Sequence, residues 1–189
     1  MAKIAAFVLA AGSSTRHKSG SKLLREFDGA PLIRRTFQLV SNCGFDESIV
    51  VLRANDANLR KHANDFGFAV VENANADRGV GSSIACGISH VGDADAVAIF
   101  LGDMPLIRPQ TVEELKFLFE KGAAPVVRPA FDGAPGHPVI ISKTYFGALE
   151  SLSGDEGAAS IFKMTDVALV ATDDEGVIRD FDVEDDFLD

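Results

Sequence analysis

Apolar runs with β-strand character alternate along this chain with stretches in which apolar residues recur at helical spacing. Helices are expected after Pro31 and from Pro109, because proline suits the first turn of a helix. Repeated strand-then-helix order predicts an α/β fold, with a mostly parallel central sheet and helices on both faces. The segments predicted to form strands are residues 4–9, 48–52, 68–71, 96–101, 125–128, 139–141 and 167–171.

The rhythm changes after Lys121, where the elements become shorter and prolines are frequent. One or more antiparallel strands are therefore expected in the last third. No stretch is long enough to serve as a linker, and no internal repeat is present. A chain of 189 residues has the length of one domain with a substantial core. We therefore expect residues 1–189 to form a single domain.

The net charge of −10 argues against a protein that wraps duplex nucleic acid, since that binding needs clustered Lys and Arg. It does not exclude binding of a nucleotide. Most of the negative charge lies in residues 173–189, which hold nine acidic residues against Arg179 alone. Acidic runs of this kind are mostly solvated surface, although part of this one could fold back across a site.

The two cysteines, Cys43 and Cys86, are expected to be reduced thiols in the core, because neither a CxxC pair nor a secretory leader is present. The apolar run at residues 4–11 is far shorter than the roughly 20 residues that span a bilayer. We therefore expect a cytoplasmic protein with no membrane and no nucleic acid as partner.

The first predicted strand ends in a loop of small and hydroxyl-bearing residues that leads to two cations. Small residues let backbone N–H groups approach phosphate oxygens, and Arg16 and Lys22 can neutralise the phosphate charge. The loop matches neither GxxxxGK[ST] nor GxGxxG, which argues against a P-loop ATPase and a dinucleotide dehydrogenase. A triphosphate loop is favoured, and a strand-to-helix turn with solvated basic residues is the alternative. The loop reads Leu9, Ala10, Ala11, Gly12, Ser13, Ser14, Thr15 and Arg16.

Asp103 directly follows the most apolar predicted strand, at the end of a strand where ligands bind in such sheets. A carboxylate there can hold Mg²⁺, which prefers oxygen ligands. Alternatively, it caps the helix that begins near Pro109. Asp180 and Asp182 alternate, so both side chains can face one side of an extended segment and supply a second metal ligand. Otherwise, both are solvated members of the acidic run.

Two further stretches can contact a substrate. Gly79, Gly81, Ser82 and Ser83 precede a predicted helix, and they can pack against a base and hydrogen-bond its edge. An ordinary helix N-terminus is the alternative. His137, confined between a glycine and a proline, can contact a substrate, although a lone histidine is more often structural. No serine lies in a GxSxG context and no histidine spacing suits zinc, so acyl transfer and a zinc site are disfavoured.

In this order, the motifs resemble those of the MobA-like nucleotidyltransferases over nearly the whole chain. The resemblance rests on Leu-Ala-Ala-Gly-Ser-Ser-Thr-Arg at 9–16 with Lys22, Gly-Asp-Met-Pro at 102–105, Gly-His-Pro-Val at 136–139, Gly-Asp-Glu-Gly-Ala at 154–158 and Asp-Phe-Asp at 180–182. The motifs at 136–139 and 154–158 resemble the molybdenum cofactor cytidylyltransferase branch. The opening motif is shared with other cytidylyltransferases and leaves the acceptor open.

The resemblance implies a Rossmann-like, GT-A-type fold and a Mg²⁺-dependent reaction. In that reaction a cytidylyl group passes from CTP to the terminal phosphate of a molybdopterin-type cofactor, releasing pyrophosphate. The catalytic residues implied are Arg16 and Lys22, which would hold the triphosphate, and Asp103, which would hold Mg²⁺ with Asp182 or Asp180. Residues 79–83 would line the cytosine pocket, whereas His137 and residues 154–157 would face the pterin. The substrate-binding residues implied are Leu9, Ala10, Ala11, Gly12, Ser13, Gly79, Gly81, Ser82, Ser83, His137, Gly154, Asp155 and Gly157.

Three departures from the family pattern keep alternatives open. The loop arginine and Lys22 are one residue further apart than usual, so Lys18 is an alternative phosphate ligand. The chain after Asp182 lacks the usual Thr and Pro, which leaves Asp180 as an alternative metal ligand. Ala159 stands where the family commonly has arginine, so another base or another phosphorylated acceptor is an alternative. Further alternatives are a catalytically weak cofactor carrier, with a molybdoenzyme or its maturation factor as partner, and, more remotely, a nucleotide-dependent oxidoreductase.

Overall fold

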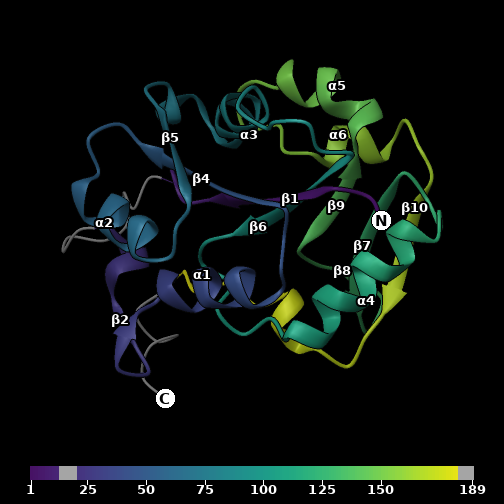
Figure 1. Cartoon of the computed structure of the whole chain (residues 1–189), viewed down its shortest axis with the longest axis horizontal. Coiled ribbons are helices and arrows are strands. Elements are labelled where there is room, and N and C mark those ends of the chain that lie inside the picture. The colour runs from purple at the N-terminus through teal and green to yellow at the C-terminus, as the bar shows by residue number, and fades with distance from the viewer. Residues whose placement is uncertain (13–20, 183–189) are drawn as a thin grey trace.

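A computed structural model describes residues 1–12 and 21–182 of the chain. The strands of its central sheet are β1 (Ile4–Leu9), β4 (Glu47–Arg53), β5 (Ala69–Asn73), β6 (Ala96–Leu101), β7 (Val126–Phe131), β8 (Ala134–Pro135), β9 (Val139–Ser142) and β10 (Val167–Ala171). The strand order is β10-β7-β9-β6-β1-β4-β5, and β8 pairs with β7 (Figure 1). All seven predicted strand segments are confirmed, three of them with unchanged end residues, whereas β8 was missed.

The sheet is mostly parallel, as expected. β1 pairs in parallel with β4 on one side and with β6 on the other, and β4 pairs in parallel with β5. β10 is parallel to β7, while β9 runs antiparallel between β6 and β7. The expected antiparallel strand in the last third is therefore confirmed as well.

Helices cover both faces of the sheet (Figure 1). The helices are α1 (Ile33–Asn42), α2 (Ala57–Asp65), α3 (Val80–Ile88), α4 (Pro109–Glu120), α5 (Phe146–Glu150) and α6 (Ala159–Phe162). Successive side chains of a strand point to opposite faces. Ala6 and Val8 therefore belong to one core cluster with residues of α1, α2 and α4, whereas Phe7 belongs to a second cluster with residues of α3, α5 and α6.

The N-terminus of α4 is capped by a residue of the acidic run. Asp174 accepts hydrogen bonds from the backbone N–H of Arg108 at 2.8 Å and from the hydroxyl of Thr111 at 2.7 Å. Its residue exposure is 1%. The alternative that Asp103 caps this helix is therefore wrong, and so is the expectation of a solvated surface at Asp174. The chain here folds back against the body of the protein, which the sequence left open.

A hairpin that the sequence analysis missed precedes α1. It consists of β2 (Glu26–Phe27) and β3 (Ala30–Pro31), joined by Asp28 and Gly29 with φ values of 50° and 77°. Two-residue turns with positive φ at both positions favour Asp-Gly, because few other residues tolerate that conformation. The Asp-Gly pair was therefore a signal for this hairpin.

Both cysteines are free, but they lie in different surroundings. Cys43 is buried, whereas Cys86 is partly exposed, so the expectation of a core thiol holds only for the former. Burial raises the pKa of the Cys43 thiol to about 11, so the thiol stays protonated at neutral pH. Within the described residues, no helix has both the length and the apolar character needed to cross a bilayer.

The substitution Asp174→Ala tests the cap of α4. It leaves the buried hydroxyl of Thr111 and two backbone N–H groups, those of Arg108 and Gly176, without their acceptor. We expect the free energy of unfolding to fall by about 2–3 kcal/mol in a urea titration. The neighbouring Asp173→Ala is the control, because that side chain is 93% exposed and its loss should change little. Equal effects of the two substitutions would contradict the cap.

Candidate active site

The first loop and Asp103 lie side by side because β1 and β6 end at the same level. Leu9 pairs with Leu101 in register, and the backbone N–H of Gly102 donates to the carbonyl of Leu9 at 3.0 Å. A Cβ at residue 102 would lie 2.8 Å from the side chain of Ile33, so glycine permits this close approach. These are the carboxyl ends of neighbouring parallel strands at the point where the strand order reverses, which is where open α/β sheets bind ligands.

Lys22 places its ammonium group between two carboxylates. It begins the 3-10 helix η1 (Lys22–Leu24), and its Nζ donates to Asp103 Oδ2 at 2.6 Å and also to Asp182 Oδ1. The side chains of Lys22 and Asp103 are 18% and 19% exposed. Burial alone would lower the pKa of Lys22, but the hydrogen bonds and charges of Asp103 and Asp182 outweigh it and raise that pKa. Lys22 is therefore firmly cationic.

Asp180 completes a cluster of three carboxylates. One ligand atom from each of Asp103, Asp180 and Asp182 lies within 4.8 Å of the others. Burial raises the pKa of Asp180, and the negative charges of Asp182 and Asp103 raise it further. Three carboxylates at this separation form a donor set that suits a hard divalent cation. Asp180 and Asp182, the two alternatives for the second metal ligand predicted from the sequence, therefore both lie close to Asp103.

The C-terminal segment reaches this cluster because Phe181 anchors it. The backbone N–H of Phe181 donates to the carbonyl of Asp103 at 3.0 Å, and its ring is buried against Phe27 with the ring centroids 5.0 Å apart. Burial of an aromatic ring contributes strongly to such a contact. Side chains alternate along the extended segment, so Asp180 and Asp182 share the side that faces Asp103.

A cleft of about 530 Å³ opens beside Asp103. It is lined by residues of four motifs that the sequence analysis treated separately: the first loop, residues 79–83, Asp103 and the loop after Gly154. The lining residues are Leu9, Ala11, Gly12, Ala76, Asp77, Gly79, Val80, Ser83, Leu101, Asp103 and Asp155. The volume is in the range of small-ligand sites, and its mouth lies at the carboxyl ends of β1 and β6.

Two glycines bring two of these motifs into contact. A Cβ at Gly79, whose φ is +98°, would lie 2.4 Å from Gly154 O and from Asp155 Oδ1. The backbone N–H of Gly81 donates to the same carbonyl at 2.9 Å, and a Cβ there would lie 2.7 Å from Glu156 O. Residues 79–81 and 154–156 therefore pack directly on one another and form a shared wall, in which Gly79, Val80 and Asp155 line the cleft, whereas Gly81 and Gly154 do not.

Asn73, the last residue of β5, hydrogen-bonds to the hydroxyls of Ser82 and Ser83. Its buried side-chain amide donates to Ser82 Oγ at 3.0 Å and to Ser83 Oγ at 3.1 Å. Ser82 Oγ also lies 2.9 Å from the carbonyl oxygens of Asn75 and Gly79. Ser82 thus stabilises the turn into α3, and of the two serines only Ser83 lines the cleft. Sequence reasoning missed Asn73, although a polar residue ending an apolar strand is a usable signal.

His137 lies near the cluster but does not line the cleft. Its backbone N–H donates to Val177 O at 2.8 Å, and Nδ1 is 3.4 Å from Ile99 O. Burial lowers the pKa of His137 to about 4, and the nearby Arg128 guanidinium acts in the same direction. The imidazole is therefore neutral at pH 7. Gly157 is also outside the cleft lining, and a Cβ there would lie 3.8 Å from the side chain of Val80.

Several candidates fall outside the lining or outside the described residues. Ala10 is buried, and its backbone N–H donates to Val51 O at 3.0 Å, so it supports the first loop from the sheet. Asp77, which sequence reasoning did not single out, lines the cleft. The candidates Ser13, Arg16 and Lys18 lie outside the described residues, and nothing follows from the structure about their positions.

A mostly parallel sheet flanked by helices, with a cleft and a carboxylate cluster at its switch point, is typical of α/β proteins that bind nucleotides. The sequence matches the MobA-like NTP transferase domain over residues 6–172. The chain therefore belongs to the MobA-like NTP transferase family, and the resemblance inferred from the motifs is confirmed. Members of this family are nucleotidyltransferases. The α/β fold expected from the sequence is confirmed by the structure.

Curated relatives match parts of this chain. The bifunctional protein GlmU of Geotalea daltonii is 34% identical over 115 residues, which cover 60% of this chain and 25% of that protein. A probable molybdenum cofactor guanylyltransferase of Thermococcus sibiricus is 38% identical over 106 residues, which cover 56% of this chain and 51% of that protein. The chain thus spans about a quarter to a half of the length of these relatives.

Solved structures match over almost the whole chain. Rv0371c from Mycobacterium tuberculosis superposes with a TM-score of 0.83 at 28% identity, covering 98% of this chain and 96% of that one. A structure of Rv0371c in complex with manganese has a TM-score of 0.80 at 27% identity, with the same coverage. A nucleotidyl transferase from Methanothermobacter thermautotroptrophicus, 21% identical with a TM-score of 0.82 over 98% of this chain and 94% of that one, supports the fold.

The substitution Gly81→Ala tests the shared wall of the cleft. The added methyl group would lie 2.7 Å from Glu156 O, so the loop at 153–156 must move. We expect the free energy of unfolding to fall by about 1–3 kcal/mol and the affinity for nucleoside triphosphate, measured by calorimetry, to fall as well. Gly147→Ala in α5 is the matched control, because its added Cβ would have no heavy atom within 4 Å other than those of its chain neighbours and its own helix backbone. An unchanged affinity in Gly81→Ala would show that this wall does not contact the nucleotide.

Proposed function

We propose that this protein transfers a cytidylyl group from CTP to the terminal phosphate of a molybdopterin-type cofactor and releases pyrophosphate. The observation that carries the proposal is the convergence of the first loop, residues 79–83 and Asp103 on one cleft, with Asp180 and Asp182 beside it. The choice of CTP and of this acceptor is supported by the motifs at residues 136–139 and 154–158, which resemble the cytidylyltransferase branch.

The proposed step needs no protein nucleophile. An oxygen of the acceptor's terminal phosphate attacks the α-phosphorus of CTP and forms a new P–O bond. The bond from the α-phosphorus to the oxygen that bridges to the β-phosphate breaks, and pyrophosphate leaves with that oxygen. Because the attacking group is already anionic, the protein's contribution is alignment and charge neutralisation.

The residues of the chain then have separate roles. Gly12 allows the backbone of the first loop to approach phosphate oxygens, and Arg16 and Lys22 neutralise their charge. Gly79 and Ser83 would bound the base, with the 154–156 loop as the outer wall. In the nucleotide-free chain, Lys22 donates hydrogen bonds to Asp103 and Asp182. We infer that its ammonium group moves to the phosphates when the triphosphate binds.

Asp103, Asp182 and Asp180 would hold the divalent cation. The fit is supported by the Lys22 ammonium group, which already lies between Asp103 and Asp182 as a stand-in cation. The manganese complex of Rv0371c supports a divalent metal in a protein of this fold. Bound there, Mg²⁺ would neutralise phosphate charge and make the α-phosphorus more electrophilic. Oxygen ligands of this kind suit Mg²⁺ and Mn²⁺ alike.

A second candidate keeps the reaction and changes the base. The relative from Thermococcus sibiricus is described as a probable molybdenum cofactor guanylyltransferase, which favours GTP as the alternative donor. The cleft offers backbone groups at Gly79, the hydroxyl of Ser83 and the carboxylates of Asp77 and Asp155, so the choice of base rests on which of these groups hydrogen-bond its edge.

Pyrophosphate release tests both candidates in one experiment. The full chain is incubated with Mg²⁺ and each of the four nucleoside triphosphates in turn, with and without molybdenum cofactor. We expect release only when CTP and cofactor are both present. Release with GTP and cofactor would replace the first candidate by the second. If no combination releases pyrophosphate but cofactor binding is still detectable, the result would instead support a cofactor carrier without catalytic activity.

The substitution Asp103→Asn should abolish turnover and preserve the fold. It removes the charge at the centre of the carboxylate cluster but keeps the size of the side chain. We expect pyrophosphate release to fall about 100-fold or more, with an unchanged circular dichroism spectrum. Asp93→Asn is the control, because Asp93 is an exposed surface residue with a side chain 86% exposed. Full activity in Asp103→Asn would remove Asp103 from the mechanism.

The substitution Lys22→Met should raise the affinity of the nucleotide-free protein for Mn²⁺, because the ammonium group and the metal compete for the same carboxylates. Charged hydrogen bonds are worth about 1.5–3 kcal/mol, and 1.4 kcal/mol corresponds to about tenfold in affinity. We therefore expect an increase of about tenfold, measured by electron paramagnetic resonance of free Mn²⁺. Lys143→Met, which removes an exposed lysine, should leave the affinity unchanged. A weaker affinity in Lys22→Met would contradict the competition.

A further inference from the structure

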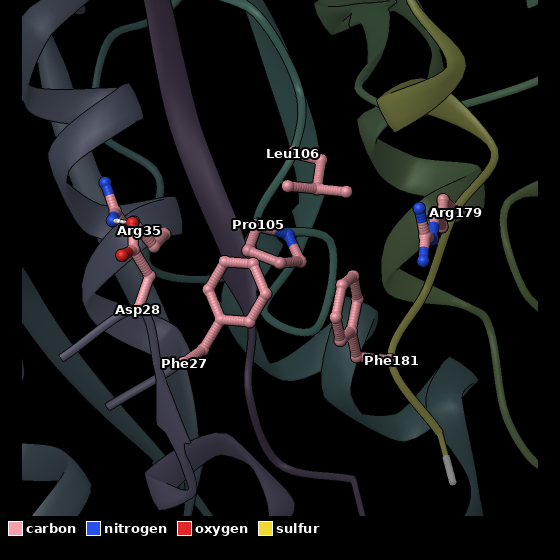
Figure 2. Close-up of a pocket in the computed structure, with 7 residues that line it drawn as sticks. All are labelled: Phe27, Asp28, Arg35, Pro105, Leu106, Arg179 and Phe181. Atoms are coloured by element: carbon pink, nitrogen blue, oxygen red, sulfur yellow. Dashed lines mark hydrogen bonds and ion pairs between the residues drawn. The ribbon is translucent and has the colours of Figure 1, made fainter. Parts of the chain in front are cut away.

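A second cavity, of about 430 Å³, lies apart from the nucleotide cleft (Figure 2). No residue lines both cavities. Four segments that are distant in sequence contribute to it: the β2–β3 hairpin, α1, the chain that follows Asp103, and the C-terminal segment. The lining residues are Phe27, Asp28, Arg35, Pro105, Leu106, Arg179 and Phe181.

The C-terminal segment separates this cavity from the carboxylate cluster. Asp180 and Asp182 belong to the cluster, whereas Arg179 and Phe181 line the second cavity. This division follows from the alternation of side chains along an extended chain. The cavity is therefore behind the metal-ligand face and is not a continuation of it.

The middle of the cavity is apolar. The rings of Phe27 and Phe181 meet edge to face at 77° with their centroids 5.0 Å apart, and Pro105 and Leu106 lie beside them in Figure 2. Leu106 is 37% exposed, so part of its side chain is accessible to a ligand. Rigid rings and a proline give a preformed surface that suits a flat apolar group.

The ends of the cavity carry charge, and the two ends differ. Arg35 is paired with Asp28, so their charges cancel. Arg179 stands at the other end, with its guanidinium carbon 5.5 Å from the centroid of the Phe181 ring. Among the described residues, no carboxylate lies within ion-pair distance of Arg179. Within the described part of the chain, the cavity therefore offers a positive charge without a carboxylate partner next to an aromatic ring, and a planar guanidinium group can bind a carboxylate or phosphate with two hydrogen bonds.

We propose that this cavity is a second ligand site, which binds a small molecule made of a flat apolar ring and an anionic group. The ring packs against Phe27, Pro105 and Leu106, and the anion pairs with Arg179. The volume of about 430 Å³ is enough for a ligand of one or two fused rings. The proposal does not depend on which nucleotide or acceptor the first cleft takes.

The test is a titration of the isotopically labelled full chain with 1-naphthoate, followed by amide chemical shifts. The neutral analogue 1-naphthylmethanol, which has the same ring system without the charge, is titrated in parallel. We expect saturable shifts at residues 27, 106 and 179–181, and weaker binding of the neutral analogue by about fivefold or more. Shifts that scatter over the surface, or that centre on residues 79–83, would overturn the proposal.

Three variants make the test specific. Arg179→Gln should weaken 1-naphthoate about fivefold or more and leave 1-naphthylmethanol unchanged, because only the charge is removed. Lys121→Gln is the matched control, since Lys121 also lies over an aromatic ring, that of Phe117 at 5.2 Å, but lines no part of this cavity. Leu106→Trp should abolish binding of both compounds by filling the cavity, at a position exposed enough to tolerate the larger side chain. Undiminished binding of 1-naphthoate to Arg179→Gln or Leu106→Trp would overturn the proposal.

Discussion

Three carboxylates whose ligand atoms lie within 4.8 Å of one another repel each other unless a cation lies among them. In this protein Lys22 supplies that cation, from a segment more than 150 residues away in sequence from Asp180 and Asp182. A positive charge therefore adds to the Phe181 contacts that hold the C-terminal segment against Asp103. The ammonium group and a divalent cation are two ways to meet the same condition, which is why the arrangement suits a metal-dependent reaction.

Close contacts between main chains fix the remaining geometry. A Cβ at Gly176 would lie 2.3 Å from Leu106 O, and a Cβ at Gly136 would lie 2.2 Å from Val177 O. The glycines thus let the C-terminal segment pack directly on the chain after β6 and on the loop before β9. Gly79 does the same for the wall of the cleft. Contacts of this kind position the carboxylates without using side chains that the site needs for binding.

Periodicity predicted the central sheet well because it reflects burial, and burial decides strand and helix positions here. It predicted Asp103 for the same reason, as a polar residue at the end of a buried strand. Periodicity could not predict contacts between residues that are distant in sequence. Nothing in the local pattern around Gly81 shows that it touches the loop at Gly154, and nothing distinguishes the buried Asp174 from its solvated neighbours. Those positions follow from tertiary packing, in which Asp174 meets the N-terminus of α4 while its neighbour Asp173 stays exposed.

The charge of the site argues that the triphosphate enters together with a cation. Asp77, Asp103 and Asp155 line the cleft, and the ammonium group of Lys22 is engaged with carboxylates. A triphosphate placed against this wall adds further negative charge in a partly buried space, where repulsion is stronger than in water. If a divalent cation entered with the nucleotide, the carboxylates and the phosphates would share its charge, and Lys22 would be free to pair with the phosphates. Binding of nucleotide and metal would then be linked by charge balance, in a chain whose net charge of −10 would otherwise disfavour an anionic ligand.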